Sequence, residues 1–291
     1  LFKNLMHKKS CIIYDKEINV SNSINKTIKN KNLKTLCLGK DFTDFKLIKH
    51  NYIGDKQFIE FIVKNKKYSF STSLLGKVQI KNLMMAIMAA HNSNIKLEKI
   101  IKSIDKIKSV NGRLEEVVKF KNNSRVILDY AHTPDALKAC LESLTEQFKF
   151  NKISIVFGCG GDRDKPKRKI MGQIANEYCH KIYLTDDNPR TENPDKIRSQ
   201  IKQNINKNKL KEIPSRKIAI SEAIKDLGVG EILLVAGKGH ENYQEYKLRK
   251  SFSDKKHILK NKNLKNETLY NNWKLNILNE KLKNKKLNKN I

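Results

Sequence analysis

The segment Ile153-Ser-Ile-Val-Phe157-Gly-Cys-Gly-Gly161 sets five mostly apolar residues directly before a glycine-rich loop. A short apolar run that ends at such a loop predicts a buried strand. Runs of the same kind occur on both sides of it, at 126–130, 181–185 and 231–235, and helical patterns separate them. Strands and helices that alternate in this way predict a parallel sheet with helices on both faces, and hence the α/β class.

The chain outside this region has a different character. Short strand-like segments come first and two helical stretches, beginning at Asn82, follow them. The strand-like segments are 11–14, 35–38, 58–63 and 67–71. The composition shifts near residue 110, and the Lys- and Asn-rich end predicts a charged helical or frayed tail. We therefore predict three parts, 1–110, 111–254 and 255–291.

The composition is strongly basic, with 60 Lys and Arg against 30 Asp and Glu and a formal net charge of +30. Only eight of the basic residues are arginines, and the lysines are scattered through every predicted element. Proteins that read bases more often use arginine forks with interleaved aromatic residues, so we favour a solvated surface over a nucleic-acid site. The hydrophobic fraction of 38% argues against a wholly disordered chain. No apolar run approaches the roughly 20 residues of a membrane span.

Five cysteines form an odd set without metal-like spacing: Cys11, Cys37, Cys140, Cys159 and Cys179. We interpret them as reduced thiols of a cytoplasmic protein. Cys159, inside the glycine-rich loop, is either a reactive thiol or, as we favour, a small filler residue.

Polar residues follow all four predicted strands at their carboxyl ends, where open α/β sheets bind ligands. The clusters are Asp129 to Asp135, Gly158 to Lys165, Thr185 to Arg190 and Ala236 to Glu241. We expect them to converge on one edge of the sheet. Arg163 and Arg190 offer planar forks for carboxylate or phosphate. Asn188 can bond a carboxylate or an ammonium, and Glu241 can accept from an ammonium. Such a set fits a zwitterionic amino acid.

Each cluster also has an ordinary structural explanation. Asp129 can cap the following turn, and His132 can be a satisfied polar residue at a strand end. Asp187-Asn188-Pro189 has the composition of a common turn, and Lys238, between two glycines, can be a solvated loop tip. The loop at 158–161 can present N–H groups to an anion, but it matches neither a Walker loop nor GxGxxG. The joint placement on one edge is stronger evidence than any single motif.

Five motifs, in a fixed order, carry a specific resemblance. They are Gly112-Arg-Leu-Glu115, Asp129-Tyr-Ala-His-Thr-Pro-Asp-Ala-Leu137, the loop from Gly158 to Lys165, Asp187-Asn-Pro-Arg-Thr-Glu192, and Gly237-Lys-Gly-His-Glu241. Together they resemble the Mur ligase family, and within it most closely the ligases that add meso-diaminopimelate. The resemblance runs from about Leu1 to Asp254 and is dense from Gly112 to Gln244.

The resemblance implies the C-terminal part of the family's central ATPase domain in 1–110 and a Rossmann-like, amino-acid-binding domain in 111–254. It implies a monomeric cytoplasmic enzyme of peptidoglycan precursor synthesis that uses ATP and Mg²⁺, with no nucleic-acid partner and no membrane insertion. ATP phosphorylates the γ-carboxylate of D-Glu in UDP-MurNAc-L-Ala-D-Glu, and the amine of meso-diaminopimelate attacks the acyl phosphate. The family's P-loop and carbamylated, magnesium-binding lysine are expected upstream of Leu1. We therefore expect a fragment without metal ligands that is inactive alone.

The resemblance also assigns site residues. Those expected at the diaminopimelate site are Arg163, Asp187, Asn188, Pro189, Arg190, Gly237 and Glu241. Asp187 and Pro189 would shape the loop, and Arg190 would discriminate, because its fork would pair with the distal carboxylate that lysine lacks. Those that match ATP-contacting positions are Asn82, Arg113, Asp129 and His132.

Other functions stay open at this point. A related ligase would add L-lysine or act like a folylpolyglutamate synthase, and Asp187-Asn-Pro-Arg190 argues against both. A non-catalytic basic binding module is supported only by the net charge. A dinucleotide-dependent enzyme would need a GxGxxG motif directly after the first strand of the sheet, and no such motif follows it.

Overall fold

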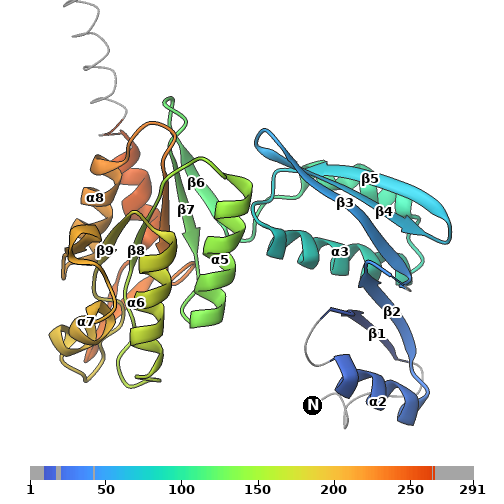
Figure 1. Cartoon of the computed structure of the whole chain (residues 1–291), viewed down its shortest axis with the longest axis horizontal. Helices are drawn as coiled ribbons and strands as arrows, with labels where there is room; N and C mark the ends of the chain where they lie inside the picture. The colour runs from blue at the N-terminus through green and yellow to red at the C-terminus, as the bar shows by residue number, and fades with distance from the viewer. Residues whose placement is uncertain (1–9, 18–20, 42, 264, 266–291) are drawn as a thin grey trace, which may run out of the picture. The chain divides into compact units, whose positions relative to one another are not determined.

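The predicted sheet is present in a computed structural model of the chain, shown in Figure 1. Its strands are β6 (Glu115–Lys119), β7 (Arg125–Asp129), β8 (Ile153–Phe157), β9 (Lys181–Leu184), β10 (Leu210–Glu212) and β11 (Ile232–Ala236). They lie in the order β10-β9-β8-β11-β7-β6. All neighbours are parallel except the edge strand β6, which pairs antiparallel with β7. The α/β class with a mainly parallel sheet is confirmed.

Helices cover both faces of this sheet (Figure 1). They are α5 (Pro134–Gln147), α6 (Lys167–Tyr178), α7 (Pro194–Lys202) and α8 (Arg216–Asp226), and residues 254–263 are also helical. On one face, Ile220 of α8 and Ile258 belong to a core cluster that includes Val126 of β7. The helices α5, α6 and α7 pack side by side in chain order on the other face. Because both faces are covered, every residue of β8 and β11 is buried.

Two helix starts show how the sequence sets these elements. Thr133 and Asn193 stand before prolines, and each side chain accepts a backbone N–H of the first turn, from Ala136 at 3.3 Å and from Asp195 at 2.8 Å. The capping side chain accepts a backbone N–H of the first turn that has no partner within the helix. Proline suits the first helical position because it has no N–H to satisfy there.

The structure describes residues 10–17, 21–41, 43–263 and 265. The chain divides into two units, Leu1–Ser109 and Val110–Ile291. Their identities as part of an ATP-binding domain and as an amino-acid-binding domain stay predictions. Of the expected tail at 255–291, residues 255–263 are helical and 266–291 lie outside the described residues.

The first unit contains a five-stranded sheet in the order β1-β2-β3-β4-β5. Its strands are β1 (Cys11–Asp15), β2 (Lys34–Gly39), β3 (Phe45–Ile53), β4 (Lys56–Val63) and β5 (Lys66–Thr72), and its helices are α2 (Ser21–Lys31), α3 (Lys77–Asn92) and α4 (Leu97–Ser103), with a 3-10 turn at Ile104–Lys106. β1 and β2 are parallel, whereas β3, β4 and β5 form an antiparallel meander. Phe45, Phe61 and Met84 are fully buried in its core.

Several elements were not predicted from the sequence. The helix α2 and the strand β3 are rich in Asn, Lys and other polar residues, which hide the period of their few buried positions. A short hairpin, β12 (Tyr243–Tyr246) with β13 (Leu248–Ser251), follows the last strand of the main sheet. In the part of the chain that the structure describes, no helix is both long and apolar enough to cross a membrane.

Candidate functional site

The loops that follow β7, β8, β9 and β11 enclose a cavity of about 480 Å³ at the carboxyl edge of the main sheet. Six of the seven residues expected to bind the amino acid line it: Arg163, Asp187, Asn188, Arg190, Gly237 and Glu241. The seventh, Pro189, is buried in the same loop as Asn188. Tyr130, His132, Lys167 and Tyr243 also contribute to the lining. The four polar clusters therefore form one site.

Arg190 is held in place by its own backbone and by two neighbours. Its φ of +54° is unusual for a residue with a side chain. The hairpin stabilises this conformation, since Arg190 N–H donates to Glu245 O (3.0 Å) and Lys247 N–H donates to Arg190 O (2.9 Å). The guanidinium Nη1 donates to Gly161 O at 2.7 Å, and Nε lies 3.5 Å from Glu245 Oε2. Two of the guanidinium nitrogens are thus in contact with the protein, and the side chain still lines the cavity.

The glycine-rich loop packs tightly against the Asp187–Arg190 loop. A Cβ at Gly158 would overlap the carbonyl oxygen of Thr185, and one at Gly161 would overlap that of Pro189. The Gly161 N–H donates to Asn188 O at 2.9 Å. At these two positions the glycines allow two loops to meet, and Gly161 does not offer its N–H to an anion as the sequence suggested.

An ion pair with a fully buried arginine holds the same two loops together. Arg168, with a fully buried side chain, donates to both carboxylate oxygens of Glu192 at 2.8 and 3.0 Å, and to Gly160 O at 3.1 Å. Glu192 also accepts the Asp162 N–H at 2.6 Å. The hydrogen bonds from Arg168 lower the pKa of Glu192 to about 2. This pair links α6, the glycine-rich loop and the loop that carries Arg190.

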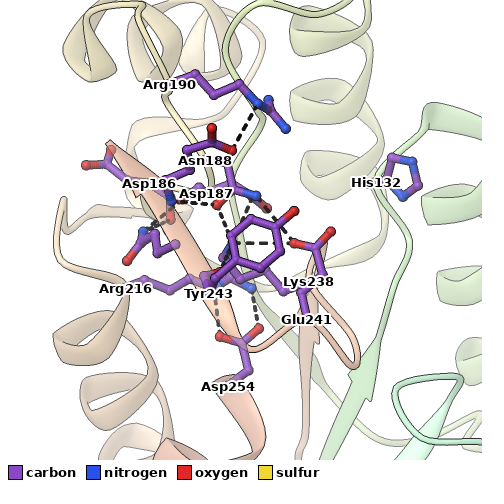
Figure 2. Close-up of polar contacts among 12 residues, drawn as sticks. His132, Asp186, Asp187, Asn188, Arg190, Arg216, Lys238, Glu241, Tyr243 and Asp254 are labelled. Atoms are coloured by element: carbon purple, nitrogen blue, oxygen red, sulfur yellow. Dashed lines mark hydrogen bonds and ion pairs between the residues drawn. The ribbon is translucent and has the colours of Figure 1, made fainter. Parts of the chain in front are cut away.

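Four residues that line the cavity, Asp187, Asn188, Glu241 and Tyr243, interlock around Lys238 (Figure 2). Lys238 is fully buried, and its Nζ donates to Asn188 Oδ1 (2.7 Å) and to Tyr243 O (3.0 Å). The carboxylates of Asp187 and Glu241 lie 3.4 and 3.7 Å from the same Nζ. Burial lowers the pKa of Lys238, and the two carboxylates oppose that effect. The alternative that Lys238 is a solvated loop tip is wrong.

The residues that match ATP-contacting positions are less concentrated. Both carboxylate oxygens of Asp129 accept hydrogen bonds from backbone N–H groups, those of Leu114 and Ala131, each at 2.7 Å. Burial raises the pKa of Asp129, and those N–H groups partly offset the rise. In this structure Asp129 therefore shapes the turn after β7, as its structural alternative proposed.

Arg113 and His132 lie close to Asp129 and share one aromatic neighbour. The guanidinium of Arg113 stands 4.8 Å from the centre of the Tyr130 ring, and the exposed His132 ring meets that ring edge-on at 4.5 Å. Asn82 belongs to the first unit, where it is an exposed residue of α3. The structure thus brings three of these four residues together around Tyr130.

Cys159 is a filler in this site. Its side chain is 4% exposed, lies 3.7 Å from the sulfur of Met171, and burial raises the pKa of the thiol to about 12. A thiol with so high a pKa carries almost no thiolate at neutral pH and is a poor nucleophile. All five cysteines are free thiols.

Comparison with known proteins agrees with this geometry. Residues 112–239 match the family model described as "Mur ligase, glutamate ligase domain". The UDP-N-acetylmuramoyl-L-alanyl-D-glutamate--2,6-diaminopimelate ligase of Rickettsia montanensis is 39% identical over 245 residues, which cover 84% of this chain and 50% of that protein. This chain belongs to the Mur ligase family.

Solved structures of Mur ligases share the fold of this chain. One of a UDP-N-acetylmuramoyl-L-alanyl-D-glutamate--2,6-diaminopimelate ligase is 29% identical, with a TM-score of 0.63, and the match covers 88% of this chain and 53% of that one. The MurF ligase of Thermotoga maritima in complex with ADP is 15% identical with a TM-score of 0.65, over 90% and 55% of the two chains. This Mur ligase chain therefore spans about half the length of the relatives that it matches.

Sequence reasoning missed several residues that build the site of this Mur ligase chain. Arg168, Glu192 and Glu245 were not singled out for positioning roles, and Lys238 was weighed only as a loop residue. One signal was available for Arg168, because arginine is rare in this lysine-rich chain and an arginine in place of a lysine can mark a site where planar geometry matters. No comparable signal marks Glu245, whose role depends on the fold of the hairpin.

Proposed function

We propose that this chain is the amino-acid-binding part of a Mur ligase that joins meso-diaminopimelate to the D-Glu of UDP-MurNAc-L-Ala-D-Glu in peptidoglycan precursor synthesis. The relative named above carries the same reaction in its name, and four of the five motifs of the resemblance contribute residues to one cavity. In this reaction ATP would convert the γ-carboxylate to an acyl phosphate. The amine would attack it, and phosphate and a proton would leave as the amide forms.

One observation carries the proposal: a single cavity is lined by two arginine guanidinium groups and by a carboxylate with an amide. Arg190 and Arg163 supply positive charge, and Glu241 with Asn188 supplies an acceptor and a hydrogen-bonding amide. An amino acid with a carboxylate at its far end needs both. Since its contacts to Gly161 and Glu245 use only part of the N–H groups of the guanidinium, Arg190 keeps N–H groups for a second carboxylate.

The role of the chain's own residues in the reaction would be binding and orientation. The Arg190 fork would hold the distal carboxylate, and Glu241 and Asn188 would hold the near ammonium and carboxylate groups. Fixing the amino acid at these points places its attacking amine and reduces the entropy cost of the encounter. L-Lysine lacks the distal carboxylate, so it could not bond the remaining N–H groups of Arg190 and would bind poorly.

The ATP contacts belong to the same proposal. Arg113 and His132, gathered around Tyr130, present cationic or hydrogen-bonding groups and a ring surface beside the cavity, which suits a nucleotide. Asp129 would act by shaping that turn, and Asn82 is proposed as an ATP contact on the sequence resemblance alone. The described residues contain no group of three or more His, Cys, Asp or Glu that could hold a metal ion.

We also propose a cytoplasmic location and a monomeric enzyme. The five free thiols suit a reducing compartment, and nucleotide-linked substrates of this kind are made where ATP is available.

Calorimetric titration of the 291-residue chain with meso-diaminopimelate and with L-lysine tests the substrate. We expect binding of meso-diaminopimelate and at least about tenfold weaker binding of L-lysine, because an unpaired buried charge costs about 2 kcal/mol. Equal binding of both would keep the family and overturn the substrate. A folded chain that binds neither would refute the proposal.

A chimera tests the activity. In the Rickettsia montanensis relative, the matched half would be replaced by the 245 matched residues of this chain. We expect ATP-dependent phosphate release with UDP-MurNAc-L-Ala-D-Glu and meso-diaminopimelate, and little release with L-lysine. The unaltered relative serves as the control for the rest of the enzyme.

A further inference from the structure

The backbone conformation around Lys238 places its side chain in the protein interior, beneath the residues that line the cavity. The flanking glycines, Gly237 and Gly239, have φ values of +113° and +51°, which favour glycine. A Cβ at Gly237 would come within 2.8 Å of Asp187 Oδ2, so this backbone passes close to the Asp187 side chain. A lysine that is 0% exposed between two such glycines is a built feature of the site.

The contacts of Lys238 decide which end of the Asn188 amide faces the ligand. Asn188 Oδ1 accepts from Lys238 Nζ at 2.7 Å and from the Glu245 backbone N–H at 3.0 Å. Two donors at one atom require oxygen there, so the amide orientation follows from the network. The Nδ2 group then points toward Glu241 Oε2, at 3.3 Å (Figure 2).

The same lysine compensates two carboxylates. Asp187 and Glu241 both lie within 4 Å of its Nζ, and their side chains are 10% and 19% exposed. The neighbouring cation, Arg216, cannot replace it, because its guanidinium is paired with the fully buried Asp254 at 2.7 and 2.8 Å. Without Lys238, the two nearby carboxylates would repel each other and Glu241 would move away from its present position.

We propose that Lys238 is a positioning residue that sets the hydrogen-bonding polarity of the pocket: it turns the Asn188 N–H toward a carboxylate of the bound amino acid and keeps Glu241 an acceptor for its ammonium. This inference rests on the proposed function. It assigns the choice that the sequence left open for Asn188, which acts as a donor. Lys238 itself touches Asn188, Tyr243, Asp187 and Glu241 and acts on the ligand through them.

The first test replaces the lysine and asks whether it acts through Asn188. We expect Lys238→Met to weaken meso-diaminopimelate binding at least about tenfold in calorimetric titration, as expected for the loss of a charged hydrogen bond. In the Asn188→Ala background the same change should cost clearly less, because its target is gone. The control, Lys169→Met, removes an exposed lysine of α6 and should bind as the wild type does. Equal costs in both backgrounds would overturn the proposal.

The second test does not require the lysine variant to fold. Asn188→Asp keeps an oxygen for Lys238 and for the Glu245 N–H, so the variant should still fold, but with a lower midpoint of thermal unfolding, because the new carboxylate oxygen replaces the Nδ2 group that donates to Glu241. It replaces the donor that faces the ligand by a carboxylate oxygen, and we expect at least about tenfold weaker binding. If Asn188 instead accepted from the ligand's ammonium, this variant would bind as tightly as the wild type or more tightly, and the inference would be wrong. Failure of the wild type itself to bind would instead refute the proposed function.

Discussion

The two walls of the cavity are built differently. The inner wall, made of Asp187, Asn188, Arg190, Gly237 and Glu241, is cross-linked by Lys238 and the hairpin, and Asn188 is only 4% exposed. The outer wall, made of His132, Thr133, Arg163, Asp164 and Lys167, follows β7 and β8, and most of its side chains are exposed. Both walls carry cations: Arg190 of the inner wall is held through both its backbone and its guanidinium, whereas Lys167 of the outer wall donates to His132 O at 2.9 Å.

This difference separates two kinds of recognition. A fixed fork that loses water on binding discriminates strongly between ligands, because an unmade bond leaves a buried charge unpaired. An exposed arginine contributes mainly attraction that solvent and salt screen. We therefore expect substitutions of the inner wall to change which amino acid binds, and substitutions of the outer wall to change mainly how salt affects binding.

The largest expected effect is that of Arg190→Ala. Loss of the fork should weaken meso-diaminopimelate binding about a hundredfold, roughly 3 kcal/mol, and leave L-lysine binding almost unchanged. Arg190→Lys should recover only part of the loss, because it keeps the charge but not the planar geometry. Calorimetric titration with both ligands measures this, and nucleotide binding should be unaffected.

Arg249→Ala is the matched control, because Arg249 pairs with the same carboxylate, Glu245 Oε2, at 3.6 Å and is 67% exposed. It should retain meso-diaminopimelate affinity to within about threefold. An Arg190→Ala variant that binds like this control would show that the inner wall does not provide the specificity.

The ion pair beneath the two loops should affect stability next most strongly. Glu192→Gln leaves the buried Arg168 without its charged partner and should lower the free energy of unfolding by about 2 kcal/mol at pH 7. The pKa of Glu192 is lowered from 4.5 to about 2, so its contribution is complete above pH 4.5 and is lost as the pH falls toward 2. Urea denaturation of wild type and variant at pH 7 and at about pH 3 should show the difference shrinking.

The control for this measurement is Glu177→Gln, which changes an exposed glutamate of α6. It should leave the free energy of unfolding within about 0.5 kcal/mol of the wild type at both pH values. A Glu192→Gln effect of the same size at both pH values would contradict the electrostatic explanation.

Much of this site was visible in the sequence because it depends on local patterns. Apolar runs located β7, β8, β9 and β11, and the carboxyl ends of parallel strands must share an edge, so the sequence alone placed Arg190 and Glu241 at one site. Asp187-Asn188-Pro189 could be read as a turn and as a ligand-binding loop, and it is an irregular loop whose Asn188 side chain lines the cavity.

The missing part depended on tertiary contacts. Nothing in Gly237-Lys-Gly239 distinguishes a solvated lysine from one that is fully buried. The burial of Lys238 depends on its contacts with Asp187, which is distant in the sequence, and with the backbone carbonyl of Tyr243. The hairpin was missed because its strands are four residues each and mostly polar. Its contact with Arg190 is therefore known only from the structure.

A smaller effect is expected on the outer wall. Arg163→Ala should weaken meso-diaminopimelate binding about fivefold at low ionic strength, and this loss should shrink as salt is raised to about 0.5 M. The residual loss for Arg190→Ala should remain large under the same conditions. An Arg163→Ala effect as large and as salt-independent as that of Arg190→Ala would remove the distinction between the walls.

The smallest predicted effect has an unusual sign. Glu245 lies 3.5 Å from Arg190 Nε and competes with any carboxylate that approaches the fork. Glu245→Gln should therefore raise meso-diaminopimelate affinity about two- to threefold, since a partly exposed ion pair contributes less than about 1 kcal/mol.

Arg249→Ala supplies the opposite change within the same group of charges. Removing Arg249 releases Glu245 to pair more closely with Arg190, so affinity should fall by up to about threefold. L-Lysine binding should not follow either trend, because lysine has no carboxylate for the fork. If both substitutions shifted meso-diaminopimelate affinity in the same direction, Glu245 would be holding the Arg190 guanidinium in place for the ligand. The specificity of the inner wall would then depend on Glu245 as well as on Lys238.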